Sequence, residues 1–131
     1  MAQQLLIVSN NPQVLDDFGH FSMHPCASYE EVLHQVRNKV HAGARLLMHP
    51  LAGSVKPGES PYRSVVIDDN EGTLDMQALE IIEGAIDRYN TLTAVPRHRV
   101  YNEQILADFQ VIDRRLLISA LTAIDPNLLR R

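Results

Sequence analysis

Four consecutive apolar residues, Leu5 to Val8, are followed directly by the polar turn Ser9-Asn10-Asn11-Pro12. An uninterrupted apolar run of this length is typical of a strand that is buried on both faces, and such strands lie in sheets covered by helices. Pro12 suits the first turn of a helix for which Asn11 is the N-cap. The chain therefore begins as strand, turn and helix, which favours a layered α/β architecture.

The same alternation continues through the first half of the chain. Phe21 to Cys26 is predicted to form a second strand, and Pro25 places it at a sheet edge because proline cannot donate a hydrogen bond to a ladder. Ser28 and Glu31 form a capping box, which predicts that a helix begins near Tyr29. Two further buried strands are predicted at Ala44 to Met48 and at Ser64 to Ile67.

The second half of the chain is helical. Thr73 can cap a helix that extends to Tyr89, and from about Asn102 the apolar residues keep helical spacing for about twenty positions. The apolar band of this last helix is wide, so the helix either lies across the sheet or is partly buried against a second copy of the chain. We expect one domain over residues 1–131, with three layers, a mostly parallel four-stranded sheet flanked by helices, and a long C-terminal helix.

Composition excludes several classes of protein. The 131 residues are 45% hydrophobic, which suits one core, and their net charge of −4 gives no long-range attraction to nucleic acid or anionic lipid. A single cysteine, Cys26, cannot form an internal disulfide or a cysteine-rich zinc site. The Leu5 to Val8 run is too short to span a bilayer and lacks the features of a signal peptide. We therefore expect a cytoplasmic protein with neither a nucleic-acid nor a membrane partner.

The connection over residues 49–64 is long for so small a domain, and loops of this length are usually functional or disordered. Its three prolines restrict the backbone and favour order. Because the loop starts at the carboxyl end of a central strand, we expect it to lie beside the turn at residues 9–12, where hydroxyl, amide and cationic groups would surround a phosphate or carboxylate. The predicted ligand-binding residues are Ser9, Asn10, Asn11, His49, Gly53, Ser54, Lys56, Ser60, Tyr62 and Arg63.

Several interpretations of this loop stay open. The favoured one is a non-catalytic binding protein that recognises a small anionic ligand or an acidic segment of a partner. A rival is a small enzyme that uses His49 as general acid or base with help from Tyr62 or a serine. A third is a purely structural homodimer, and a fourth is a proline-stiffened cover with solvated Lys56 and Arg63. Neither a Walker A loop nor a GxGxxG fingerprint is present, and the histidine spacings do not suit a metal, so we expect neither a cofactor nor a metal ion.

The loop also resembles a known family. The matching residues are His49-Pro50-Leu51, Gly53-Ser54, Lys56-Pro57, Pro61-Tyr62 and Ser64, together with Ile7 to Pro12 and Asp108 to Asp113. They are similar to the GrdX family, small proteins encoded with the glycine, sarcosine or betaine reductase systems of amino-acid-fermenting anaerobes. The resemblance implies an accessory role near these reductases, with a reductase-system protein as a partner. It does not imply reductase chemistry, because Cys26 lies outside the matching segments.

Overall fold

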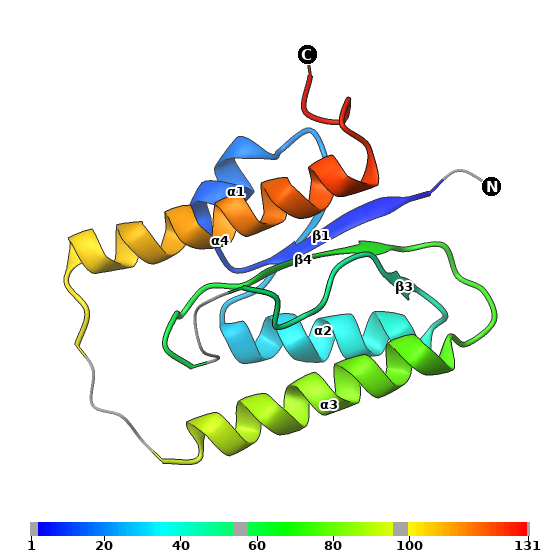
Figure 1. Cartoon of the computed structure of the whole chain (residues 1–131), viewed down its shortest axis with the longest axis horizontal. Coiled ribbons are helices and arrows are strands. Elements are labelled where there is room, and N and C mark those ends of the chain that lie inside the picture. The colour runs from blue at the N-terminus through cyan, green and yellow to red at the C-terminus, as the bar shows by residue number, and fades with distance from the viewer. Residues whose placement is uncertain (1–2, 54–57, 96–99, 131) are drawn as a thin grey trace.

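The structure is a computed structural model that describes residues 3–53, 58–95 and 100–130. Helices cover both faces of a central sheet, with α1 and α4 on one side and α2 and α3 on the other (Figure 1). The α/β class, the four strands and the long C-terminal helix are therefore confirmed. The elements are β1 (Leu5–Ser9), α1 (Pro12–Asp17), β2 (Ser22–Pro25), α2 (Tyr29–His41), β3 (Arg45–Leu46), β4 (Ser64–Asp68), α3 (Met76–Thr93) and α4 (Glu103–Ile124).

The sheet is mixed, and the prediction of a mostly parallel sheet was wrong. The strand order is β2-β1-β4-β3, in which β1 is parallel to β2 while β4 is antiparallel to both β1 and β3. A parallel pair needs a crossover connection, usually a helix, and the described part of the chain between β3 and β4 contains no helix. This connection instead returns to the edge where β1 ends, because Ser64 pairs with Ser9. Apolar runs correctly identified β1 and β4 as buried strands but carry no information on strand direction. The prediction of a buried, central strand over Ala44 to Met48 was wrong, because β3 is a two-residue strand at the sheet edge with Arg45 exposed.

The first turns of α2 and α3 differ in which residue caps them. The Ser28 hydroxyl accepts the Glu31 N–H at 3.1 Å and the Glu31 carboxylate accepts the Ala27 N–H, so α2 begins at Tyr29 as predicted. For α3 the expected cap was wrong. Asp75, and not Thr73, is the N-cap, because the Asp75 carboxylate accepts two backbone N–H groups of the first turn.

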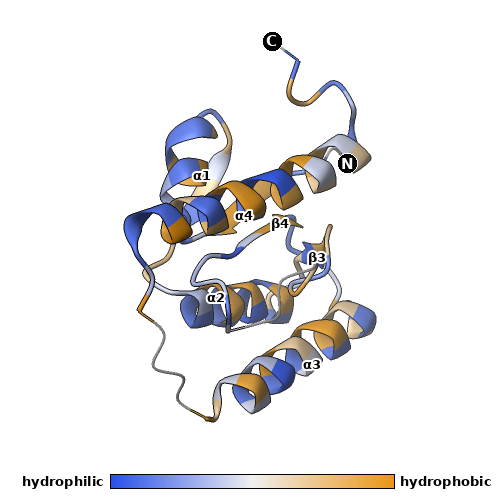
Figure 2. Ribbon diagram, turned by 60° about the vertical axis from the view of Figure 1, so that its left-hand side comes forward, coloured by the Kyte–Doolittle hydropathy of each residue, from blue (hydrophilic) through white to orange (hydrophobic). Residues whose placement is uncertain are grey.

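The two faces of the sheet bury separate apolar clusters, and the helices turn their apolar residues towards them (Figure 2). Side chains alternate along β1, so Leu6 and Val8 pack under α2 and α3 while Ile7 packs under α1 and α4. None of the helices in the described ranges combines the length and apolarity that a membrane span requires. Ser9, the polar last residue of β1, is fully buried, and the site lies at this end of the strand.

Candidate functional site

The turn after β1 and the end of the long loop lie side by side. The Asn10 side chain donates to the Pro61 carbonyl at 2.8 Å and accepts the Arg63 N–H at 2.8 Å, and the Asn10 N–H donates to the Arg63 carbonyl at 3.3 Å. These bonds join two segments that are about fifty positions apart in the sequence. Asn10 therefore fixes the position of Arg63 at this edge of the sheet.

A buried polar group, which we call the Asp113 cluster, lies directly beneath this junction and consists of Ser9, Asn11, Ser64 and Asp113. The Asp113 carboxylate accepts the Ser64 N–H at 2.9 Å, the Ser64 hydroxyl at 2.7 Å and the Asn11 amide at 3.0 Å. Because the Ser64 hydroxyl proton goes to Asp113, the Ser9 hydroxyl donates to Ser64 Oγ at 2.7 Å. Ser9 Oγ in turn accepts the Asn11 N–H at 3.0 Å. The cluster is a directed chain of hydrogen bonds that ends on the carboxylate.

The polar atoms of the Asp113 cluster form hydrogen bonds with other groups of the protein. The second amide hydrogen of Asn11 goes to the Gln110 carbonyl at 2.9 Å, and Asn11 Oδ1 accepts the Gln13 N–H at 3.0 Å as the cap of α1. All four side chains are buried. This arrangement ties the end of β1, the start of β4 and the middle of α4 together.

Sequence reasoning missed Asp113 as a member of this edge. The sequence placed it only within the Asp108 to Asp113 segment that resembles the family, with no assigned role. A signal was present, because Asp113 precedes the buried Leu117 and Leu121 by four and eight positions and so shares their face of α4. A carboxylate within the apolar stripe of a helix indicates a buried polar partner.

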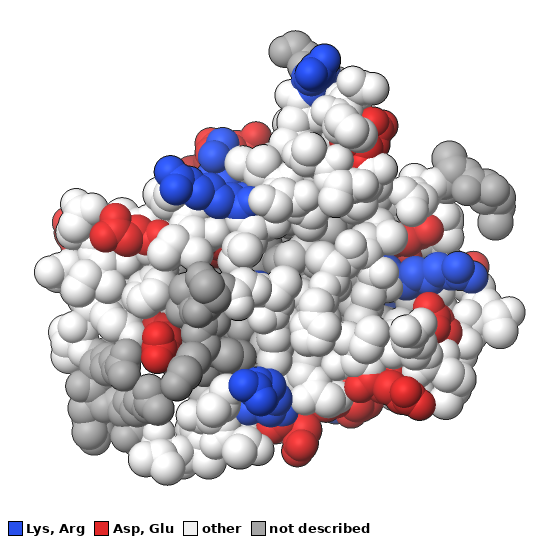
Figure 3. Space-filling view, viewed as in Figure 1, with Lys and Arg blue, Asp and Glu red and all other residues white. Residues whose placement is uncertain are grey.

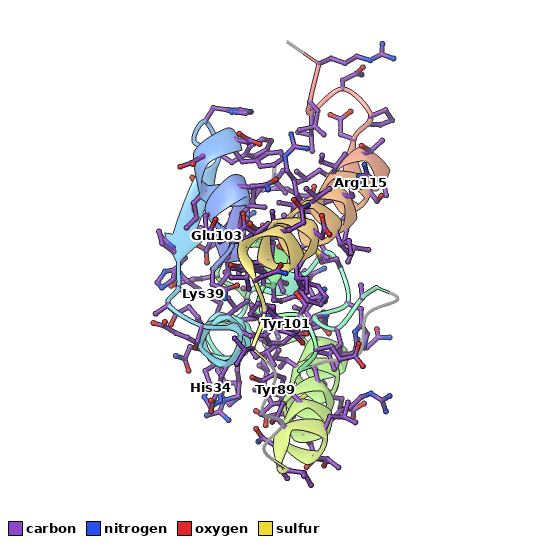
Figure 4. All side chains as sticks on the ribbon, turned by 90° about the vertical axis from the view of Figure 1, so that its left-hand side faces the viewer. His34, Lys39, Tyr89, Tyr101, Glu103 and Arg115 are labelled. Carbon is purple, nitrogen blue, oxygen red and sulfur yellow. The ribbon has the colours of Figure 1, made fainter. Side chains whose placement is uncertain are left out.

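Arg63 forms the second feature of the edge. Its side chain is only 3% exposed, and its guanidinium donates to the Ala52 carbonyl at 2.6 Å. The guanidinium carbon lies 5.5 Å from the centroid of the Tyr29 ring, which stacks on Tyr89 with a centroid distance of 4.9 Å. Figure 4 shows Tyr89 on α3, so loop, α2 and α3 all contribute. We call Arg63, Tyr29 and Tyr89 the Arg63 cluster.

Two buried polar atoms of the Arg63 cluster, Arg63 Nε and the Tyr29 hydroxyl oxygen, make no hydrogen bond of standard distance and angle with the described residues. No carboxylate of the described chain lies within ion-pair distance of Arg63. Burial raises the pKa of Tyr29 above its usual value, and the positive charge of Arg63, together with the close contact between its side chain and the Tyr29 hydroxyl, opposes part of this shift. Tyr29 therefore keeps its proton at neutral pH and can donate it in a hydrogen bond.

Gly53 and the loop residues from 59 to 62 contact α4 or the segment directly before it. The Tyr101 hydroxyl donates to the Glu59 carbonyl at 2.6 Å, and the Gln110 amide donates to the Tyr62 hydroxyl at 3.0 Å. The Ser60 hydroxyl accepts the Tyr62 N–H at 3.1 Å. Gly53 has a φ of +126°, and a Cβ there would lie 2.6 Å from Leu116 of α4. The predicted residues Gly53, Ser60 and Tyr62 thus make contacts within the protein.

The other predicted residues lie apart from this arrangement. His49 is exposed, and its Nδ1 accepts the Leu51 N–H at 3.0 Å. Among the described residues, no hydroxyl lies within hydrogen-bonding distance of the His49 ring, so the geometry supplies no general acid–base pair there. Ser54 and Lys56 lie outside the described residues.

Two further features bear on chemistry at this end of the sheet. Burial, and to a smaller extent the Glu31 carboxylate, raise the pKa of the Cys26 thiol to about 11, so this thiol is protonated at neutral pH and is a poor nucleophile. Within the described parts of the chain, no group of three or more histidine, cysteine, aspartate or glutamate residues is placed to hold a metal ion.

Comparison with known proteins gives one match. A family model described as GrdX-like protein matches residues 6–122, a range that includes the turn after β1, the long loop and most of α4. Neither the curated proteins nor the solved structures provide a match.

Proposed function

The chain belongs to the GrdX-like family, and we propose that it is a non-catalytic accessory protein that binds a small anionic group, a carboxylate or a phosphate, at Arg63. The family match supports an association with glycine, sarcosine or betaine reductase systems. In this proposal the protein acts beside a reductase of such a system and does not itself carry out reduction. The protonated Cys26 thiol agrees with that assignment.

One observation carries the proposal: Arg63 is a buried cation whose guanidinium makes no ion pair with a carboxylate of the described residues. Taking a charged group out of water is strongly unfavourable unless it is paired and hydrogen-bonded. The Ala52 carbonyl and the face of the Tyr29 ring satisfy only part of the guanidinium, and Arg63 Nε keeps a free N–H. A bound anion would supply the missing charge and accept that hydrogen bond.

The chemistry of the two unpartnered atoms favours an acceptor as the ligand. Arg63 Nε can only donate, and the neutral Tyr29 hydroxyl has a proton to donate. Carboxylate and phosphate oxygens accept such bonds, whereas an ammonium group cannot. Because both side chains are at most 5% exposed, the bound group would be small and shielded from water, which strengthens charge-assisted hydrogen bonds.

The predicted ligand residues fall into two roles in this proposal. Asn10 positions Arg63, and the Asp113 cluster holds the neighbouring Ser64 in place, so these residues act through Arg63. Ser54 and Lys56 stay predicted donors to the same anion. Nothing in the described geometry favours the alternative of an enzyme that uses His49.

Calorimetric titration with inorganic phosphate and with acetate tests the proposal. We expect Arg63→Met to weaken binding of the preferred anion by about tenfold or more, the scale of a lost charge-assisted hydrogen bond. Arg88→Met is the matched control, because Arg88 is exposed on α3 and makes no hydrogen bond or ion pair with the described residues. Lys56→Ala is also expected to weaken binding of this anion.

The outcomes separate binding from folding. Thermal unfolding of each variant shows whether the fold is intact, and only folded variants are compared. Wild-type protein that binds neither probe, or Arg63→Met protein that binds as tightly as wild type, would contradict the proposal.

A further inference from the structure

The outer face of α4 carries a regular stripe of exposed side chains. Only three of its 22 residues are buried, and the helix packs against α1 and β4. On the opposite face, the large apolar side chains of Ile105 and Ile112 are 39% and 38% exposed. The stripe, with spacings of three and four residues, consists of Ile105, Asp108, Ile112, Arg115 and Ser119.

The two charged residues of the stripe make few interactions with the described part of their own chain. Asp108 accepts one hydrogen bond, from Gln104 one turn earlier in the same helix. Arg115, labelled on α4 in Figure 4, makes no hydrogen bond or ion pair with the described residues. The neighbouring Arg114 differs, because its Nε lies 2.8 Å from the Asp17 carboxylate of α1. Figure 3 shows acidic and basic groups one after the other along α4.

We propose that this stripe pairs with the same stripe of a second copy of the chain, the two α4 helices running antiparallel about a twofold axis near Ile112. At a rise of about 1.5 Å per residue, Asp108 lies about 6 Å before Ile112 along the axis and Arg115 about 4.5 Å after it. In an antiparallel pair, the partner's Arg115 therefore lies within about 1.5 Å, along the axis, of the level of Asp108. Two ion pairs flank a central contact between isoleucines.

The order of the charges along the stripe favours a second copy of the chain as the partner, and favours an antiparallel orientation of the two α4 helices. A parallel pair would place Asp108 against the partner's Asp108 and Arg115 against the partner's Arg115, which is repulsive. A different partner with charges of one sign would satisfy only one of the two residues. A second copy in antiparallel orientation satisfies both, because a twofold axis makes every contact reciprocal.

Charge reversal tests the pairing. Sedimentation equilibrium of the wild type is expected to show a dimer, and Arg115→Asp or Asp108→Arg alone is expected to raise the dimer dissociation constant by at least about tenfold, because each places like charges opposite one another. The double variant D108R/R115D restores the opposite-charge contacts and should dimerise like the wild type. The control is Arg88→Asp, the same charge change on the exposed face of α3, which should have no effect.

The result that overturns the proposal is a wild-type protein that stays monomeric up to millimolar concentration. A dimer that tolerates both single reversals, or a folded double variant that stays monomeric, overturns it equally, because the dimer would then use another surface or another register. Circular dichroism of each variant establishes that it is folded. The Arg63→Met variant should dimerise normally, which keeps this proposal separate from anion binding.

Discussion

Two buried charges lie at the same edge of the sheet, and their surroundings differ. Asp113 and Arg63 are each 3% exposed. The Asp113 carboxylate accepts three hydrogen bonds, whereas Arg63 donates one side-chain hydrogen bond and keeps a buried N–H without a partner. Burial alone therefore does not identify a binding residue. The two residues differ in how many of their hydrogen bonds are formed. A buried charge whose hydrogen bonds are all formed within the protein stabilises the fold, whereas one that keeps a donor without an acceptor is available to a ligand.

The largest effect is expected from Asp113→Ala. Removing the carboxylate leaves the Ser64 N–H, the Ser64 hydroxyl and one Asn11 amide hydrogen buried without their acceptor. Because unpaired buried donors are unfavourable, we expect the free energy of unfolding in urea to fall by about 3 kcal/mol or more. The control is Asp87→Ala on the exposed face of α3, which should change it by less than about 0.5 kcal/mol. Equal effects of the two variants would remove the structural role assigned to Asp113.

A smaller loss is expected from Ser64→Ala, about 1–3 kcal/mol, because the Ser64 N–H still reaches Asp113. Ser9→Ala removes the next hydroxyl in the chain of hydrogen bonds. Since the two hydroxyls share a bond, the double variant should lose less than the sum of the two single losses, by at least about 0.5 kcal/mol. Exact additivity in urea denaturation would show that the two serines do not act as a chain.

These clusters also show what the sequence could and could not predict. The start of α2 was predicted correctly, because the capping box that determines it spans only Ser28 to Glu31. The antiparallel direction of β4 was not predicted, because it depends on the sheet edge to which the preceding loop returns. Arg63 was predicted as a cation of the site or a solvated side chain, and its burial depends on Tyr29, which is distant in the sequence. Contacts of this kind are set by the tertiary fold and leave no local pattern.

Arg63→Met should affect stability far less than Asp113→Ala does. The variant loses the bond to the Ala52 carbonyl and the contact with the Tyr29 ring, but it also removes a buried, partly unpaired charge. Because these contributions oppose each other, we expect the free energy of unfolding without ligand to change by less than about 1 kcal/mol. A loss as large as that of Asp113→Ala would make Arg63 a structural residue and end the contrast between the two charges.

The smallest effect at neutral pH is expected from Tyr29→Phe, which keeps the ring on Tyr89 and beneath Arg63 but removes a hydroxyl that has no partner in the described chain. We expect the free energy of unfolding at pH 7 to change by less than about 0.5 kcal/mol, since no hydrogen bond of standard distance and angle is lost. Although its stability is unchanged, the variant should bind phosphate or acetate more weakly than the wild type if the hydroxyl donates to the bound anion.

Alkaline pH separates this variant from the wild type in stability as well. Burial holds the pKa of Tyr29 above its usual value of 10.0 in the folded protein. The unfolded chain therefore releases this proton first, and the corresponding stability is complete below pH 10 and is lost as the pH rises above it. The unfolding free energy of the wild type should fall more steeply above pH 10 than that of Tyr29→Phe, in which only the other titrating groups contribute. Identical pH profiles would mean that the Tyr29 hydroxyl reaches water in the folded protein, and the case for it as a shielded donor to a bound anion would be lost.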